Sequence, residues 1–193
     1  MNRRQLLLST GAAILALLSS RAHAQTDQTL RIVVPFAPGG SSDRGARILA
    51  DGLGQKLGQT VVVENRTGAG GRLAAQQLKG AAASQNVLLL ANPAIMVIAP
   101  LVFKDAGYDP DRDFQPVSQI SDYEFGLAVS TGVPVKELSH LLAWLRANPA
   151  QANFGVPATG SLPHFFALMT GQKAGVDAQV VGYRGSGPLI SDL

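Results

Sequence analysis

A glycine turn followed by hydroxyl and carboxylate side chains is the feature of this sequence best suited to bind a charged ligand. Residues 30–36 are mostly apolar and suit a strand covered on both faces, and Ser41, Ser42 and Asp43 are typical of the N-cap of the helix expected over 44–57. Backbone N–H groups at a helix start lack intrahelical partners and carry the positive end of the helix dipole. The corner predicts a carboxylate or phosphate site, although an ordinary strand-to-helix turn has the same pattern.

A second corner repeats this device. A short strand is expected at 153–156, and Thr159, Gly160 and Ser161 then lead into a helix that has Pro163 in its first turn and extends to about Lys173. If the two corners belong to lobes that face each other across a hinge, both line one cleft. A dicarboxylate or an amino-acid-sized anion can then be held with one end at each corner. This geometry needs no nucleophile.

Other chemistry is less well supported by the residues. Ser161, His164 and Asp43 could be imagined as a hydrolase triad, but no serine stands in a G-x-S-x-G elbow. Gly68, Gly70 and Gly71 do not fit the G-x-G-x-x-G spacing of dinucleotide sites, and indicate a turn that allows close packing. We therefore expect no catalytic residue and no cofactor.

Metal and anion ligands outside the two corners are also sparse. The chain has no cysteine and 3 histidines, and the acidic run at 105–113 lacks the spacing of a calcium loop, so no metal site is expected. Arg66 and Arg72 flank the glycine turn and could attract an acidic ligand. Because exposed arginines are usually solvated, we interpret both as solvated.

The first 24 residues have the pattern of an export signal. Arg3 and Arg4 precede an apolar run over 6–18, and Ala22-His23-Ala24 is a small-x-small cleavage site, which predicts cleavage after Ala24 and a periplasmic protein. Either a Sec or a twin-arginine route is compatible with the two arginines. The chain has 16 Lys+Arg and 13 Asp+Glu, and removal of Arg3, Arg4 and Arg21 leaves it formally neutral. Nucleic-acid binding is therefore not expected.

The remaining residues alternate between strand and helix patterns. Strands are expected at 60–64 and 86–91 with a small-residue helix at 72–83 between them, which together with the first corner gives a mainly parallel sheet. Residues 104–113 are polar and turn-rich, and we interpret them as a crossing between lobes. Strands at 116–120 and 125–130 and an amphipathic helix at 135–147 follow, in which Trp144 is expected to pack rather than bind. The predicted division is a signal at 1–24, a first lobe at 25–105 and a second lobe at 106–193.

Four motifs in this order resemble the Bug-type solute receptors of tripartite tricarboxylate transporters. They are the run from Arg31 to Asp43, the run from Val62 to Gly71, Tyr108-Asp109-Pro110 before Asp113-Phe114, and Gly160-Ser161-Leu162-Pro163-His164. The resemblance covers essentially everything after the signal. It implies an α/β, type II periplasmic-binding-protein fold with two lobes and mainly parallel sheets.

The resemblance also implies a function and a set of binding residues. A receptor of this kind captures a small organic anion, such as a di- or tricarboxylate or an acidic amino acid, and delivers it to membrane permease subunits; we expect it to be monomeric. The alternative is an exported enzyme or adaptor that uses the same fold. The expected ligand-binding residues are Phe36, Pro38, Gly39, Gly40, Ser41, Ser42, Asp43, Asn92, Thr159, Gly160, Ser161 and His164.

The departures of the sequence from the family pattern include one at a predicted binding residue and one in length. Asn92-Pro93 stands where the family more often has a Gly-Thr/Ser-rich turn, which leaves the Asn92 contact open. Receptors of this kind run to about 300 residues, consistent with two domains of ordinary size. With 193 residues, we expect a partial receptor with an incomplete second lobe and weak or no binding.

Overall fold

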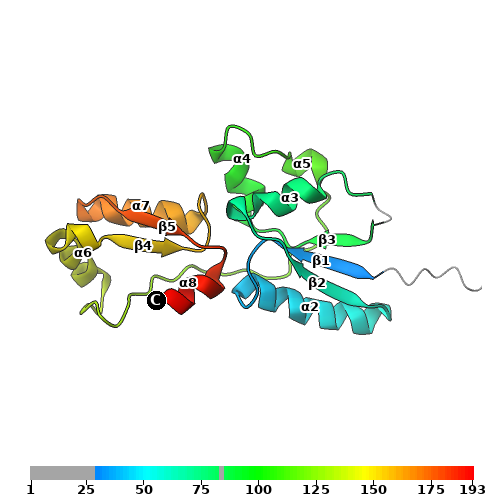
Figure 1. Cartoon of the computed structure of the whole chain (residues 1–193), viewed down its shortest axis with the longest axis horizontal. Helices are drawn as coiled ribbons and strands as arrows, with labels where there is room; N and C mark the ends of the chain where they lie inside the picture. The colour runs from blue at the N-terminus through cyan, green and yellow to red at the C-terminus, as the bar shows by residue number, and fades with distance from the viewer. Residues whose placement is uncertain (1–28, 83–84) are drawn as a thin grey trace, which may run out of the picture.

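The computed structural model describes residues 29–82 and 85–193, and it has two α/β lobes joined end to end (Figure 1). The predicted signal at 1–24 lies outside the described residues. The first lobe contains β1 (Leu30–Val34), α2 (Ser41–Leu57), β2 (Val61–Asn65), η1 (Ala69–Gly71), α3 (Arg72–Leu78), β3 (Val87–Leu89), η3 (Ala94–Ile98), α4 (Ala99–Val102) and α5 (Pro110–Asp113). The second contains α6 (Leu138–Ala147), η4 (Pro149–Gln151), β4 (Asn153–Val156), α7 (Leu162–Ala174), β5 (Gln179–Gly182) and α8 (Ser186–Asp192).

The first lobe is a three-layer sandwich around a parallel sheet with strand order β2-β1-β3. Successive side chains of a strand point to opposite faces, so Ile32 and Val34 of β1 pack with Ala46 and Ala50 of α2. Val33 packs on the other face with α3. The sheet is therefore covered on both sides, as the apolar run in β1 predicts.

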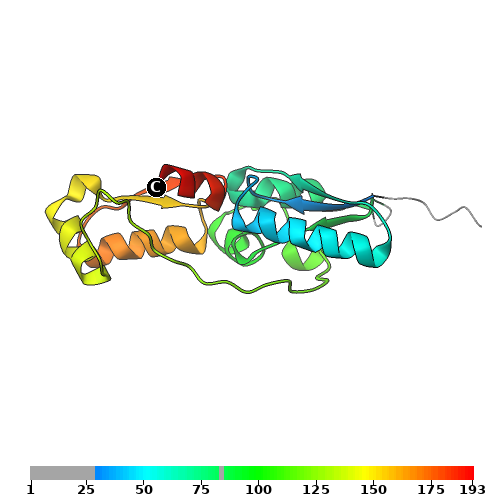
Figure 2. The same cartoon turned by 90° about the horizontal axis from the view of Figure 1, so that it is seen from below.

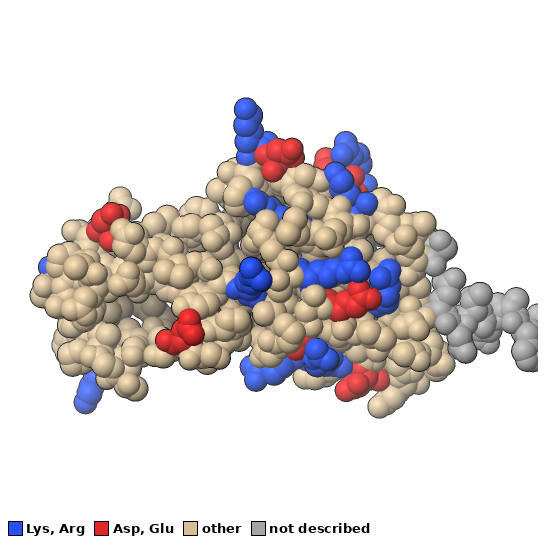
Figure 3. Space-filling view, viewed as in Figure 1, with Lys and Arg blue, Asp and Glu red and all other residues tan. Residues whose placement is uncertain are grey.

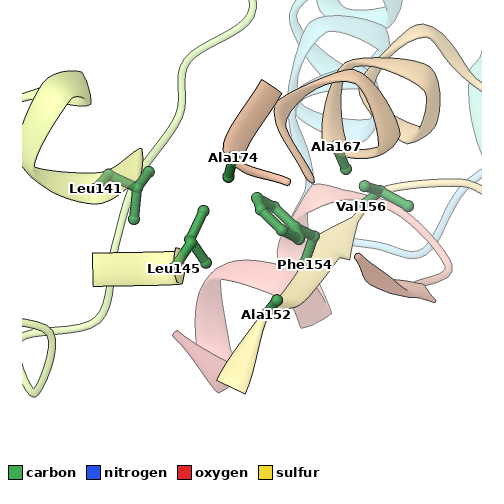
Figure 4. Packing of buried hydrophobic residues seen from close by; sticks show 7 residues of the cluster. All are labelled: Leu141, Leu145, Ala152, Phe154, Val156, Ala167 and Ala174. Carbon is green, nitrogen blue, oxygen red and sulfur yellow. The ribbon is translucent and has the colours of Figure 1, made fainter. Parts of the chain in front are cut away.

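The second lobe is built on two parallel strands, β4 and β5. Apolar side chains from α6, α7, β4 and the residue before β4 form its core (Figure 4), which consists of Leu141, Leu145, Ala152, Phe154, Val156, Ala167 and Ala174. Trp144 packs against this cluster, as predicted. On the opposite face, Gly155 leaves room for Leu189 of α8, since an added Cβ there would lie 2.4 Å from Leu189 Cδ1.

The two predicted strands at 116–120 and 125–130 do not form. Residues 114–137 contain no helix or strand and run as an extended chain from the first lobe to the second (Figure 2). Alternating apolar residues favour strands only when a neighbouring strand completes their hydrogen bonds. None of the described strands pairs with this segment, and Val117 and Leu127 remain 80% and 59% exposed.

The polar stretch at 104–113 is part of the first lobe rather than the crossing itself. Ala106 and Tyr108 are buried against Ala75, and Phe114 packs beside them. The chain therefore leaves the first lobe after Phe114, later than the predicted boundary between 105 and 106. Several helix bounds also differ from prediction: α3 ends at Leu78 rather than near 83, and α6 begins at Leu138 rather than at 135.

Candidate functional site

A cavity of about 380 Å³ lies where the two lobes meet. This volume is in the range of small-molecule sites. The loops that line it follow the carboxyl ends of β1, β2, β4 and β5, which is where parallel sheets bind ligands. The lining residues are Pro35, Phe36, 68–72 and Phe103 from the first lobe, and Pro157, Thr159 and 182–184 from the second.

Contacts between the lobes flank this cavity on two sides. On one side, the N–H of Ala37 donates to the carbonyl of Arg184 at 2.7 Å, and the N–H of Ser41 donates to Ser186 Oγ at 3.1 Å. On the other side, Gly70 meets the second lobe so closely that an added Cβ would lie 2.7 Å from the carbonyl oxygen of Thr159. Gly70 also has φ +68°, a conformation that glycine adopts without strain. The lobes are thus in contact around the cavity.

The first corner is organised by a buried carboxylate. Asp43 is 3% exposed and accepts hydrogen bonds from Gly39 N at 2.9 Å, from Arg47 Nε and Nη2 at 3.0 Å, and from Asn65 Nδ2 at 2.9 Å. Asn65 also donates to the carbonyl of Phe36. The hydrogen bonds from Arg47 lower the pKa of Asp43 to about 2, against the opposing effect of burial. Asp43 therefore fixes the loop that carries Phe36 to Gly39.

The start of α2 differs from the prediction in its cap. Gly40, not a serine or Asp43, is the N-cap residue, and no side chain caps the helix. Ser41 Oγ instead lies 3.4 Å from Ser186 Oγ, at the start of α8. Pro38 and Gly40 face the same helix start, because an added Cβ at Gly187 would lie 3.2 Å from Pro38 O and 3.3 Å from Gly40 N. Figure 1 shows α8 next to the start of α2.

The second corner contributes Thr159 to the cavity. Ser161 occupies the N-cap position of α7, but its hydroxyl donates to the carbonyl of Ala158 at 2.7 Å instead of capping the helix. His164 Nδ1 accepts a hydrogen bond from Gly160 N at 2.9 Å. Both side chains therefore fix the turn that presents Thr159. Ser161 and His164 each bond to a backbone group and not to each other.

Of the residues predicted to bind a ligand, the structure brings Phe36 and Thr159 together at the cavity. Pro38, Gly39, Gly40, Ser41, Ser42 and Asp43 form the neighbouring first corner, and Gly160, Ser161 and His164 form the turn behind Thr159. Asn92 does not line the cavity, and its Oδ1 accepts a hydrogen bond from Ile95 N at 3.3 Å.

Two arginines line the cavity, although neither was among the residues predicted from the sequence to bind a ligand. Arg72 comes from the first lobe and Arg184 from the second, and no Asp or Glu lines the cavity within the described part of the chain. The solvated interpretation of Arg72 is therefore wrong. Its place directly after the β2 turn, at the carboxyl end of the sheet, is the signal that could have found it. Arg66, in contrast, pairs with Glu64 at 2.9 Å and does not line the cavity.

No group of three or more His, Asp or Glu residues that could hold a metal ion occurs in 29–82 or 85–193. Within the same ranges, no helix combines the length and apolar character needed to cross a bilayer.

Charged side chains are unevenly spread: in the face shown in Figure 3, most Lys and Arg lie over the first lobe and near the junction with the second.

Solved structures with this architecture include the periplasmic binding protein BugD, which matches with a TM-score of 0.71 and 27% identity over 86% of this chain and 55% of that one. The structure of R. palustris Rpa4515 with adipate matches with a TM-score of 0.76 and 31% identity, over 88% of this chain and 56% of that one. MatC from Rhodopseudomonas palustris with bound malate matches with a TM-score of 0.73 and 29% identity, over 86% and 56%. The fold is thus part of the two-lobe periplasmic-binding-protein fold, as predicted.

Sequence comparison identifies the family. The sequence profile of the tripartite tricarboxylate transporter family receptor matches residues 45–193, and protein BugT of Bordetella pertussis is 34% identical over 165 residues. That alignment covers 85% of this chain and 51% of BugT. The chain belongs to the tripartite tricarboxylate transporter receptor family, which confirms the resemblance seen in the motifs. It spans between 51% and 61% of the length of the curated relatives it matches.

Proposed function

We propose that this protein is an extracytoplasmic receptor, which captures a small carboxylate-bearing solute between its lobes for a tripartite tricarboxylate-type transporter. The observation that carries the proposal is the cavity between the lobes, lined by Arg72 and Arg184 and by no carboxylate among the described residues. Unopposed positive charge in a partly enclosed site attracts anions. Adipate and malate in the two related structures support the same class of ligand.

The rest of the site suits binding rather than reaction. Ser161 and His164 hydrogen-bond to backbone groups, and the carboxylate oxygens of Asp43 accept from Gly39, Arg47 and Asn65. Ser161, His164 and Asp43 are therefore not joined to one another in the hydrogen-bonded arrangement that acyl transfer requires. We propose that the solute leaves the site chemically unchanged and passes to membrane permease subunits. We also propose a periplasmic location, with the signal removed after Ala24, and a monomeric receptor.

A titration followed by NMR tests the proposal and tolerates the weak binding expected for a chain that spans about half the length of its relatives. Adipate, malate, citrate and glutamate would be added to the ¹⁵N-labelled 193-residue chain at constant ionic strength. We expect at least one of them to shift the backbone amides of Gly68 to Gly71 and of Tyr183 together, with one dissociation constant. Adipamide, a neutral analogue of adipate, should not.

Two outcomes would contradict the proposal. One is the absence of any shift at the cavity for every carboxylate, and the other is an equal response to adipamide. Analysis of the recovered solutes by mass spectrometry addresses the enzyme alternative, because a receptor returns each solute intact. Conversion of any of them would favour an exported enzyme on the same fold.

A further inference from the structure

Arg72 has an unusual environment for a cavity arginine. It is the first residue of α3, and its Cζ lies 3.4 Å from the centroid of the Phe103 ring. Its Nε and Nη1 atoms are buried and have no hydrogen-bond partner. The guanidinium therefore stacks on an aromatic face, which stabilises the cation, while its Nε and Nη1 remain without an acceptor.

Three other arginines of the first lobe have carboxylate partners. Arg47 forms two hydrogen bonds to Asp43, and Arg31 and Arg66 both bond to Glu64. A buried donor without an acceptor destabilises the protein, and the cost is larger for a charged group. An anion in the cavity that accepts from Arg72 gains a charge-assisted hydrogen bond from a guanidinium whose Nε and Nη1 have no acceptor in the protein, so its binding is favoured by more than long-range attraction.

Phe103 fixes the position of the stack. Its ring packs against the second lobe so closely that an added Cβ at Gly160 would lie 2.9 Å from Phe103 Cε2 and Cζ. Arg72, Phe103 and Gly160 therefore form a continuous contact from one lobe to the other. The guanidinium stays at the cavity wall as long as the lobes remain together.

Arg184 provides positive charge from the opposite lobe. Its side chain is exposed and lines the same cavity, while its carbonyl accepts the hydrogen bond from Ala37. A ligand with two carboxylates can meet one arginine with each end. A ligand with one carboxylate leaves one cation without a partner.

We propose that Arg72 is the specificity-determining residue of the site: held on Phe103, it binds one carboxylate of the ligand through two N–H groups, and Arg184 pairs with the other carboxylate. The planar guanidinium fork matches a carboxylate in a way that a lysine ammonium does not. The inference rests on the proposed function, since it assigns residue roles within the same cavity. It adds that dianions are preferred over monoanions of the same length.

The test compares adipate with hexanoate, which has the same number of carbons and one carboxylate. Both are titrated into the ¹⁵N-labelled chain, and the side-chain Nε–Hε resonance of Arg72 is followed after its assignment through Arg72→Lys. We expect adipate to shift this resonance and to bind at least about tenfold more tightly than hexanoate, as a charge-assisted bidentate contact implies.

Variants separate the role of Arg72 from general electrostatics. Arg72→Gln should lower the affinity for adipate at least about tenfold and the affinity for hexanoate less than about threefold. Arg72→Lys should recover only part of the lost affinity for adipate. Arg66→Gln is the matched control, because it also removes one positive charge beside the glycine turn but does not line the cavity; we expect less than about a twofold change.

The outcomes distinguish this inference from the proposed function. If adipate shifts the amides of Gly68 to Gly71 but not the Arg72 resonance, and Arg72→Gln binds adipate as the unmodified chain does, the role of Arg72 is refuted while the receptor function stands. An equal loss of affinity for adipate and hexanoate in Arg72→Gln would also refute the role of Arg72. No shift at the cavity with any carboxylate would refute both.

Discussion

Replacing Asp43 by asparagine tests the buried carboxylate that organises the first corner. Asn has nearly the same shape but no charge, so it cannot form the paired charged hydrogen bonds to Arg47 Nε and Nη2, both 3.0 Å long. The substitution also disturbs the hydrogen bonds that the side chain of residue 43 accepts from Gly39 N and Asn65 Nδ2. The loop that carries Phe36 to the cavity depends on this set of bonds.

The size of the effect follows from the pKa of Asp43, which is lowered from 3.8 to about 2, chiefly by the hydrogen bonds from Arg47. At about 1.36 kcal/mol per pH unit, this shift corresponds to about 2 kcal/mol of stability when the group is ionised in both states. Because the folded-state pKa is the lower one, this stabilisation is present above about pH 4 and is lost as the pH falls from about 4 to 2.

Urea unfolding followed by circular dichroism at several pH values between 7 and 2 measures this contribution. We expect Asp43→Asn to lower the free energy of unfolding by about 2 kcal/mol or more at pH 7, and the difference from the unmodified chain to shrink by about 2 kcal/mol toward pH 2. Asp51→Asn is the control, because Asp51 is exposed on the same helix and has no hydrogen bond or ion pair among the described residues. A pH-independent difference, or one no larger than that of Asp51→Asn, would refute the reasoning.

Two further predictions, each with a comparison variant, concern packing in the second lobe and the contact between the lobes. Leu145→Ala removes a side chain that is 3% exposed in the second-lobe core, so unfolding followed by fluorescence of Trp144, the single tryptophan, should show a loss of about 3 kcal/mol. Leu138→Ala, at a position that is 59% exposed, should cost less than about 0.5 kcal/mol; similar losses would contradict the assignment of this core. Gly70→Ala would place a Cβ 2.7 Å from Thr159 O on a residue with φ +68°. We therefore expect urea unfolding to show a free energy of unfolding lower by at least about 1 kcal/mol. Gly52→Ala, within α2 and with nothing within 4 Å of the added Cβ, should instead stabilise by about 0.5–1 kcal/mol, and a stabilising Gly70→Ala would contradict the close contact.

Local sequence patterns were sufficient for much of the first lobe and for the core of the second. The apolar run of β1, the end of α2 before Gly58 and the burial of Leu141 and Leu145 in α6 each depend on residues close in sequence. The motifs were also sufficient for the family, because several occurred together in order. The segment at 116–130 was not predictable in this way, because alternation indicates strand propensity but does not show whether a partner strand lies beside it.

The candidate site was only partly predictable for a similar reason. Phe36 and Thr159 follow strand ends, and the rule for parallel sheets places them at the cavity. The partners of the hydroxyls could not be predicted, since Ser41 meets Ser186 of α8 and Ser161 bonds to Ala158. The role of Arg72 depends on its stacking against Phe103, a tertiary contact that no local pattern indicates.

A crystal structure of the chain grown with adipate tests most directly whether the cavity between the lobes binds a carboxylate. We expect adipate between Phe36 and Thr159, with one carboxylate against the guanidinium of Arg72 and the other toward Arg184. Adipate bound elsewhere, such as in the groove beside Phe166 and Met169, with the cavity between the lobes empty, would contradict it.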